Sequence, residues 1–268
     1  MADRLRFQNI KLGGTSWVLP GGGNFFDNMR RLSNDVDDME VVLWDNEYGS
    51  NIPTKADVKR LRDLRDKLNM SCCVHFSTNV SFETSEQART RCEDKCLRTM
   101  ELFSELDPYA WVLHLHGELF GPLPSNNMPW FYEATRKSAQ RLASATDFPE
   151  KICAENLDFS LDYIIDIVKE VGFSVCLDIG HLVHTREDVK ANVEKFLPYS
   201  RILHLHGVKP DEKLTDHVDL SYFDQTLLEW IFRKLADGRD RIMDLEVFED
   251  DFEKSINVLR KFKAERAL

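Results

Sequence analysis

The stretch Val175-Cys-Leu-Asp-Ile-Gly-His181 decides how the chain folds, because it joins a buried strand to a polar turn. Its apolar opening follows Phe173 and is typical of a parallel strand that is covered on both faces. Gly180 allows the backbone to turn sharply beside Asp178 and His181. These two polar residues fit two interpretations. Asp178 caps the next helix beside a surface imidazole, or both residues are metal ligands at the C-terminal end of the strand.

The same pattern of an apolar strand followed by an amphipathic helix recurs along the whole chain. Seven further strands are predicted near 10–18, 39–44, 72–75, 110–117, 151–155, 201–207 and 241–247. Helices are predicted near 25–32, 55–68, 85–106, 130–144, 161–171, 186–196, 223–236 and 252–264. This alternation is that of a (β/α)8 TIM barrel, so we expect a single α/β domain over residues 1–268. A doubly wound open sheet is the alternative, but no G-x-G-x-x-G turn follows the first strand.

The composition argues against several classes of partner. A formal net charge of -11 disfavours nucleic acid, which proteins bind through basic surfaces. No apolar run approaches the roughly 20 residues of a membrane span, and residues 1–11 are too charged for a signal peptide. The cysteines form no C-x-x-C pair and indicate reduced thiols, so we expect a cytoplasmic protein. Helical faces of TIM barrels often pair, and a homodimer is compatible with this chain.

One pentapeptide occurs twice, as Leu113-His-Leu-His-Gly117 and as Leu203-His-Leu-His-Gly207. Both copies lie at the end of a predicted strand. Alternate residues of a strand point to the same side, so we expect the two histidines of each copy to share a face. Either a duplication of half a barrel, or convergence on presenting an imidazole at a strand end, explains the repeat.

Acidic and imidazole side chains gather near the C-terminal ends of the predicted strands. They are His75, His114, His116, Glu155, Asp178, His181, His204, His206 and Glu246, with His217 in the loop after the seventh strand. In a barrel these ends form one rim, and no Lys or Arg stands among them. Such a group would be unsatisfied or repulsive without a cation. Imidazoles with carboxylates suit Zn²⁺, Mn²⁺ or Fe²⁺ rather than Ca²⁺, so we expect a divalent metal site of one to three ions.

The residues leave two chemistries open at this rim. Two or three clustered ions would suit phosphodiester hydrolysis, because such clusters hold phosphate oxygens and activate water. One ion would suit the isomerisation or epimerisation of a sugar. In that case Glu155 and Glu246 could serve as the paired acids that transfer protons.

The polar residues and their neighbours resemble a known superfamily. The residues that carry the likeness are His75, Val-Leu-His114, Ala-Glu155-Asn, Leu-Asp178-Ile-Gly-His181, Leu-His204-Leu and Leu-Glu246. They are similar to the endonuclease IV branch of the xylose isomerase-like TIM barrels. The resemblance implies metal-ligand roles for His75, His114, Glu155, Asp178, His181, His204, His217 and Glu246. Where endonuclease IV has Asp-x-His in the late loop, this chain has Thr215-Asp-His217, so a three-metal cluster lacks one carboxylate or takes it from Asp216.

Longer stretches of sequence, spread over nearly the whole chain, resemble a narrower family. Among them are Gly14-Thr-Ser-Trp17, Ser50-Asn-Ile-Pro53 and Cys176-Leu-Asp-Ile-Gly-His-Leu182. They are similar to the cobamide-remodelling phosphodiesterases called CbiR. The resemblance implies a metal-dependent hydrolase that cleaves the phosphodiester or phosphoribosyl linkage in the nucleotide loop of vitamin B12-type cobamides, so that the lower base can be exchanged. The alternatives are a sugar isomerase or epimerase of the same superfamily and a non-catalytic corrinoid-binding protein.

Roles can be assigned to individual residues on this hypothesis. The principal metal is expected to be held by Glu155, Asp178, His204 and Glu246, and the cluster is expected to be completed or extended by His75, His114, His181 and His217. Catalysis is expected to involve Glu155 and Glu246, while His116 and His206 support the ligands or protonate the leaving group. A corrinoid needs a wide apolar cleft, which could be walled by Trp17, Trp44, Leu119, Phe120, Met128, Trp130 and Phe131. Each of these side chains could instead pack between the barrel and its helices.

Overall fold

The computed structural model of the chain describes residues 4–77, 81–82 and 85–266, and its centre is a closed barrel of eight parallel strands. The strands are β2 (Ile10–Thr15), β3 (Asp38–Val42), β6 (Ser71–His75), β7 (Trp111–Leu113), β8 (Ile152–Glu155), β9 (Ser174–Asp178), β10 (Ser200–Leu205) and β11 (Arg241–Leu245). Each strand pairs in parallel with the next, and β2 closes the ring because it pairs with both β3 and β11. The predicted (β/α)8 barrel is therefore confirmed.

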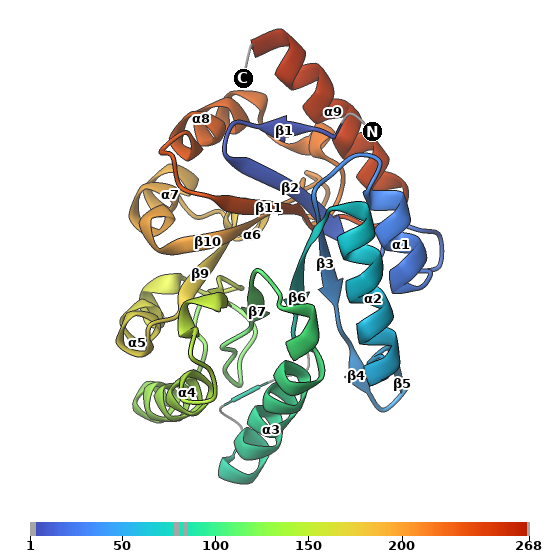
Figure 1. Cartoon of the computed structure of the whole chain (residues 1–268). Helices are drawn as coiled ribbons and strands as arrows, with labels where there is room; N and C mark the ends of the chain where they lie inside the picture. The colour runs from blue at the N-terminus through green and yellow to red at the C-terminus, as the bar shows by residue number, and fades with distance from the viewer. Residues whose placement is uncertain (1–3, 78–80, 83–84, 267–268) are drawn as a thin grey trace.

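Helices surround the barrel and cover its outer face (Figure 1). They are α1 (Phe25–Leu32), α2 (Lys55–Leu68), α3 (Glu86–Leu102), α4 (Met128–Ala143), α5 (Ile165–Val171), α7 (Val189–Phe196), α8 (Gln225–Leu235) and α9 (Asp250–Arg266). Their starts follow local signals in the sequence. The side chains of Asn24, Thr54 and Ser85 each accept a hydrogen bond from an amide in the first turn of the helix that follows. Thr54 and Asp57 also form a reciprocal capping box.

Several short elements were not predicted from the sequence. They are β1 (Arg6–Phe7), β4 (Asp45–Asn46), β5 (Gly49–Ser50) and α6 (Ile179–His184), with 3-10 turns at η1 (Ser104–Leu106), η2 (Pro149–Lys151), η3 (Leu161–Tyr163), η4 (Leu197–Tyr199) and η5 (Leu220–Tyr222). Another difference is that β7 ends at Leu113, whereas the strand was predicted to reach Gly117. The chain folds back there and passes close to Pro124. A Cβ on Gly117 would stand 2.1 Å from the Pro124 carbonyl oxygen, so only glycine fits. His114 and His116 therefore lie beyond the strand.

The buried apolar side chains form two separate clusters. The strands and the helices enclose the larger one, which holds most of the buried leucine, isoleucine and phenylalanine side chains. The smaller one consists of Cys73, Ala110, Val112, Cys153, Cys176, Ile202 and Ile242. On five strands a polar residue stands two positions further on, at His75, Glu155, Asp178, His204 and Asp244. Because alternate residues of a strand point to the same side, these polar side chains lie directly above the smaller apolar cluster.

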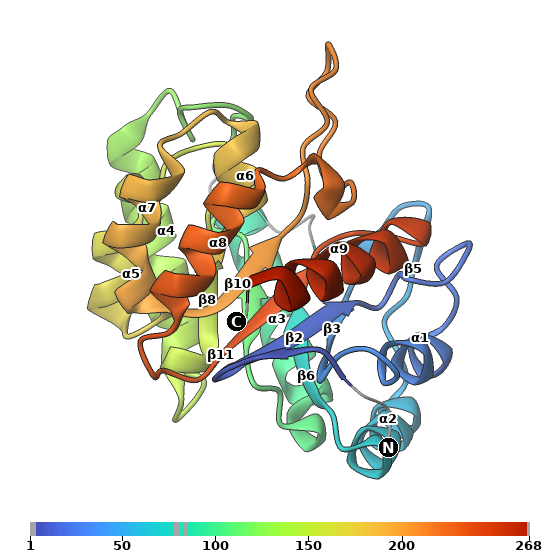
Figure 2. The same ribbon diagram turned by 90° about the horizontal axis from the view of Figure 1, so that it is seen from above.

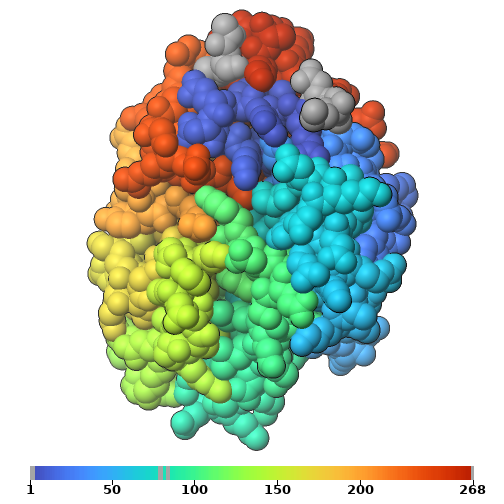
Figure 3. All heavy atoms as spheres, viewed as in Figure 1, coloured from blue at the N-terminus to red at the C-terminus, as the bar shows by residue number. Residues whose placement is uncertain are grey.

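The N-terminal segment covers the opposite end of the barrel. The Arg4 guanidinium donates to the carbonyl oxygens of Leu68 and Asn69, at 2.5 and 2.7 Å, at the end of α2. The Asn9 side chain donates to the carbonyl oxygen of Arg239, which precedes β11. Figure 3 shows this blue segment between the cyan end of α2 and the orange chain before β11. The polar rim is therefore the end of the barrel that this segment leaves open.

Within the ranges that the structure describes, no helix has the length and apolar character needed to cross a membrane.

Arg241 and Asp237 provide a test of how the closed end of the barrel is held. Arg241 is buried at the start of β11 and pairs with Asp237 through contacts of 2.7 and 2.9 Å. Its hydrogen bonds lower the pKa of Asp237 to about 2. An unfolded aspartate has a pKa near 3.9, so the stabilisation is complete above about pH 4 and is lost as the pH falls toward 2.

We therefore expect Asp237→Asn to lower the free energy of unfolding by a constant amount between pH 5 and 7, and by less at pH 3. Urea denaturation of both proteins at each pH measures the difference. Asp240→Asn is the matched control, since within the described residues the Asp240 carboxylate makes no ion pair. A gap between wild type and Asp237→Asn that widens on acidification would contradict the assignment.

Candidate metal centre

Four of the predicted ligands meet above the apolar interior of the barrel. Glu155 ends β8, Asp178 ends β9, His204 lies in β10 and Glu246 follows β11. The Nδ1 atom of His204 lies 2.8 Å from Glu155 Oε1 and 3.1 Å from Glu246 Oε2. The same nitrogen lies 3.7 Å from Asp178 Oδ2. These four buried residues, called the central group below, have ligand atoms close enough to hold one ion.

The central group has the unsatisfied acceptors that a cation would require. Asp178 Oδ2 and Glu246 Oε2 are buried and accept no hydrogen bond from any of the residues that the structure describes. Three carboxylates that share one buried space repel one another unless positive charge compensates them. The set of oxygen and nitrogen donors therefore fits a divalent transition metal.

Asp178 caps the next helix, as one of the two interpretations from the sequence requires, and its second oxygen stays available for the other. Its Oδ1 atom accepts the amide N–H of His181 at 2.6 Å and caps α6. Its backbone is held on both sides by the Asn156 side chain, which accepts the Asp178 amide N–H and donates to the Asp178 carbonyl oxygen, each at 2.8 Å. The capping oxygen leaves Oδ2 directed at the central group. One carboxylate therefore starts a helix and offers a ligand atom at the same time.

A first group of imidazoles extends the site on the side of β6 and β7. His114 Nε2 lies 2.8 Å from Glu155 Oε2, and His75 Nε2 lies 3.4 Å from the same oxygen. The His75 and His114 rings are perpendicular, with centroids 4.7 Å apart. Since Glu155 gives its other oxygen to the central group, this carboxylate could bridge two ions. We call this set the His75 wing.

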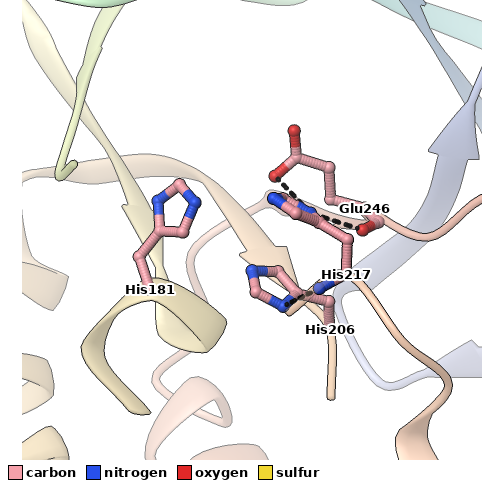
Figure 4. A group of neighbouring side chains, drawn as sticks. All are labelled: His181, His206, His217 and Glu246. Carbon is pink, nitrogen blue, oxygen red and sulfur yellow. Dashed lines mark hydrogen bonds and ion pairs between the residues drawn. The ribbon is translucent and has the colours of Figure 1, made fainter. Parts of the chain in front are cut away.

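A second group of imidazoles lies on the other side and is drawn in Figure 4. It consists of His181, His206 and His217, together with Glu246, and its ligand atoms all lie within 4.8 Å of one another. The His206 and His217 rings are stacked, with centroids 4.2 Å apart, and the His181 ring stands nearly perpendicular to His217 at 5.5 Å. We call this set the His181 wing. Asp216, the substitute carboxylate that the sequence offered in the late loop, lies 3.9 Å from His217 Nε2 and 3.4 Å from His184 Nδ1.

His217 belongs to the long segment between β10 and η5, which Figure 2 shows as an orange loop that stands clear of the barrel. Its backbone has a φ of +52°, a conformation that few residues other than glycine adopt. Its amide N–H donates to His206 Nδ1 at 3.0 Å, and the Gly207–Val218 bridge anchors the base of the loop. The strained backbone thus turns His217 back toward the rim.

Three of the imidazoles are held in the tautomer that metal ligands use. Nδ1 of His75, His181 and His217 lies 2.7, 2.9 and 3.0 Å from the carbonyl oxygen of Phe76, Asn156 and Glu246, respectively. A carbonyl oxygen only accepts, so each Nδ1 carries the proton and donates it. Each Nε2 is then left with its lone pair available to a cation.

Burial and mutual attraction set the charges of the site. Burial alone would raise the pKa of Glu155, but the charge of His204 and the hydrogen bonds from the imidazoles hold it well below its usual range. Burial also opposes protonation of His75 and His181, yet the neighbouring carboxylates raise the pKa of each to about 9. Burial lowers the pKa of His114. His75 and His181, unlike His114, therefore help to balance the negative charge of the carboxylates when no cation is bound.

His206 is buried where either of its nitrogens could carry the proton. Its Nδ1 accepts the His217 amide N–H at 3.0 Å and also lies 3.1 Å from the carbonyl oxygen of Gly207. Its Nε2 faces Asp178 Oδ1 at 3.3 Å. A proton on Nε2 makes the ring a support for Asp178, whereas a proton on Nδ1 frees Nε2 as a ligand. Gly180 makes room for this ring, since a Cβ there would stand 2.3 Å from it.

His116 lies away from the metal-ligand groups. The common face predicted for His114 and His116 rested on strand alternation, and β7 ends before both residues. The His116 ring packs against Phe120 at 4.6 Å and against Phe159 at 6.4 Å between centroids. Phe120 is 85% exposed, so this pair borders the rim from outside.

Two of the predicted aromatic residues line a cavity of about 380 Å³ beside β2 and β3. Trp17 and Trp44 form its walls, and its other lining residues include Ser16, Phe25, Phe26, Asn51, Pro53 and Asp57. Trp17 contacts Phe248 at 6.4 Å between centroids, and Phe248 contacts His217 at 5.7 Å. An aromatic path therefore joins the cavity to the His181 wing.

The remaining aromatic predictions lie around α4. Phe131 is fully buried in the outer core, which is the packing role that the sequence left open. Trp130 stands half-buried in the first turn of α4, where its amide N–H donates to the Asn127 side chain.

Sequence reasoning missed three buried acids inside the barrel, namely Asp38, Glu40 and Asp244. Burial raises the pKa of Asp38 to about 6 and that of Asp244 well above its usual range. Glu40 Oε1 lies 3.2 Å from His204 Nε2. The available signal was a charged residue inside the apolar run Met39-Glu-Val-Val-Leu43, which a buried strand does not otherwise need.

A barrel with carboxylates and imidazoles at the C-terminal ends of its strands defines the class of TIM-barrel proteins with a candidate metal centre at the rim. The chain belongs to the xylose isomerase-like TIM barrel family, whose model matches residues 32–262. A search of curated protein sequences finds no significant match.

Solved structures similar to the chain share its fold at low sequence identity. A D-tagatose 3-epimerase-like protein superimposes with a TM-score of 0.75 at 20% identity, covering 95% of this chain and 97% of that chain. The 3-keto-D-glucoside 4-epimerase YcjR of E. coli gives 0.70 at 12% identity, covering 95% and 99%. The IolI protein, solved with a bound zinc atom, gives 0.70 at 13% identity, covering 95% and 97%. The two epimerase names match the alternative activity expected from the sequence, and none of the three names a phosphodiesterase.

Metal analysis can separate the role of Asp178 from that of His181. Asp178→Asn keeps a side chain that caps α6 but removes the charged ligand, so we expect it to lose the ion of the central group. His181→Ala should lose only an ion of the His181 wing. The metal content of protein dialysed against metal-free buffer measures both.

His184→Ala is the matched control, because His184 lies on the same helix and pairs with Asp216 rather than with the central group. Full metal content in Asp178→Asn would contradict the assignment of the central group.

Gly180 and His206 permit a test in which the effect of one substitution on the free energy of unfolding changes sign. Gly180→Ala should destabilise the protein by roughly 1–3 kcal/mol, because the new Cβ collides with the His206 ring. In a His206→Ala background the collision is gone, and alanine in α6 should then be neutral or stabilising by up to about 1 kcal/mol. Urea denaturation of the double-mutant cycle measures the coupling. Equal effects of Gly180→Ala in both backgrounds would show that the two residues do not interact.

Proposed function

We propose that this protein is a metal-dependent phosphodiesterase that acts on the nucleotide loop of a cobamide. The observation that carries the proposal is the pair of imidazole wings on either side of the central group. The central group suffices for one ion, and Glu155 and Glu246 each connect it to a wing. Ligands for further ions are superfluous in a single-metal isomerase but suit the clamping of a phosphodiester.

The charge of the site supports an anionic substrate only when cations are present. Divalent cations at the rim would neutralise the phosphodiester, orient it and activate the attacking water. The protein's own part is to hold the ligands in place. The carbonyl oxygens of Phe76, Asn156 and Glu246 orient three imidazoles, and the Asn156 side chain fixes Asp178.

Two histidines outside the central group divide the remaining roles. His206 is buried between Asp178 and His217, so it supports the ligands of the His181 wing. His116 is half-buried beside the exposed Phe120, so it would meet a leaving group that extends past the metal-ligand groups. We therefore assign protonation of the leaving group to His116.

The cavity between Trp17 and Trp44 supports a substrate with a planar apolar part. Its volume of about 380 Å³ suits a single fused ring system, such as the lower base of a cobamide, and is too small for the whole corrinoid. The macrocycle would then remain outside, over the rim. Phe248 connects this cavity to His217, so that the base and the phosphodiester would be bound side by side.

A keto-sugar epimerase is the second candidate function. It is favoured by the central group taken alone, in which Glu155 and Glu246 approach His204 as two separate carboxylates. Such a pair can remove and return a proton on the two faces of a carbon next to a carbonyl. The epimerases among the structures that share this fold point in the same direction.

One incubation distinguishes these functions. Protein loaded with Zn²⁺ or Mn²⁺ is mixed with adenosylcobalamin or with a keto sugar such as D-fructose, and the products are identified by mass spectrometry and sugar chromatography. We expect a corrinoid that has lost its nucleoside, no new sugar, and loss of activity on chelation. The mass of the product also shows which linkage is cleaved.

Two other outcomes would overturn the proposal. Conversion of the sugar with intact cobamide would favour the epimerase. Cobamide that is bound and recovered unchanged would favour a non-catalytic corrinoid-binding protein. A Glu155→Gln variant serves as the inactive control, because it removes the carboxylate shared by the central group and the His75 wing.

A further inference from the structure

His204 differs from the other imidazoles of the site in the nitrogen that it presents. In His75, His181 and His217, Nδ1 donates to a backbone carbonyl oxygen and Nε2 is left for a ligand role. In His204 it is Nδ1 that faces the central group, at 2.8 Å from Glu155 Oε1. The atom that must carry the proton in the metal-bound state is therefore Nε2.

An acidic side chain, that of Glu40, lies beside His204 Nε2. Its Oε1 atom lies 3.2 Å from Nε2, and both residues are fully buried. Neither Glu40 oxygen accepts a hydrogen bond from the parts of the chain that the structure describes, and His204 Nε2 has no hydrogen-bond partner there either, so the two groups meet at ion-pair distance with their hydrogen-bonding capacity unused. A buried carboxylate without a donor is unfavourable, so the two groups are complementary.

The place of Glu40 in the barrel explains why it reaches this nitrogen. Glu40 lies in β3 and pairs in register with Thr15 of β2 and Cys73 of β6. His204 comes from β10, on the far side of the barrel interior, so its ring spans the barrel between the central group and Glu40. The carboxylate thus lies below the rim, because its register partner Cys73 stands two residues before His75 at the end of β6.

We propose that Glu40 is a positioning residue that holds His204 in the Nε2-protonated tautomer and so turns Nδ1 toward the metal of the central group. It does for His204 what the three backbone carbonyl oxygens do for the other imidazoles. A carboxylate is a stronger acceptor than a carbonyl and also makes the imidazole a better electron donor to the metal. The inference rests on the proposed metal centre, since it assigns a residue that orients one of its ligands.

Zn²⁺ affinity, measured by competition with a chromophoric chelator, tests this role. Glu40→Ala should bind the central-group ion roughly 10- to 100-fold more weakly than wild type, the range typical of residues that orient metal ligands. Glu40→Gln should restore most of the affinity, because its amide oxygen still accepts the Nε2–H. The unfolding of the metal-free variants in urea is measured alongside, to show that each is folded.

Asp38→Asn is the matched control. Asp38 is a second buried acid of the same strand, and it accepts the Cys73 amide N–H at 3.2 Å rather than contacting His204. We expect its Zn²⁺ affinity to stay within a few-fold of wild type. If Asp38→Asn lost as much Zn²⁺ affinity as Glu40→Ala, the loss would follow from removing any buried negative charge. That result would overturn the proposal.

The remaining outcomes separate this inference from the function on which it rests. Wild-type affinity in folded Glu40→Ala would overturn the role of Glu40 and leave the metal centre intact. Equal losses in Glu40→Ala and Glu40→Gln would show that Glu40 is itself a ligand or acts by its charge, and would overturn the positioning role. A wild-type protein that takes up no Zn²⁺ would overturn both the metal centre and the inference.

Discussion

The parallel pairing of β2 with both β3 and β11 is the constraint on which the rest of the structure depends. It converts an open sheet into a ring, so strands that are far apart in sequence must end on the same rim. The ends of β8, β9, β10 and β11 then bring three carboxylates within 4 Å of one imidazole nitrogen. Since the apolar cluster below keeps water out, the charges can be balanced only by one another or by a bound cation.

Much of this arrangement could be predicted from sequence because it follows from periodicity. Apolar runs that alternate with amphipathic helices give the barrel, and the barrel then gives the rim. Glu155, Asp178, His204 and Glu246 stand two residues beyond interior positions or directly after a strand, so the fold alone brings them together. The prediction needed no knowledge of loops.

Loops and tautomers could not be predicted, because they depend on contacts between distant segments. His116 was expected to share a face with His114, but the early end of β7 removed the strand geometry on which that expectation rested. Glu40 was hidden in an apolar run, and its partner His204 is distant in sequence. The cap and ligand interpretations of Asp178 are compatible, because the two oxygens of its carboxylate face different directions.

The hydrogen bonds from His75, His181 and His217 to backbone carbonyl oxygens have a consequence for how the site can change in evolution. The orienting atoms belong to the main chain, so a substitution at Phe76, for example, alters a side chain but leaves the carbonyl oxygen that orients His75. The cavity beside Trp17 and Trp44 consists of side chains and has no such protection. Substitutions can therefore change which substrate the cavity beside the rim binds, while the main-chain oxygens keep these three imidazoles in the same orientation. His204 is the exception, because its neighbour Glu40 can be lost by a single substitution.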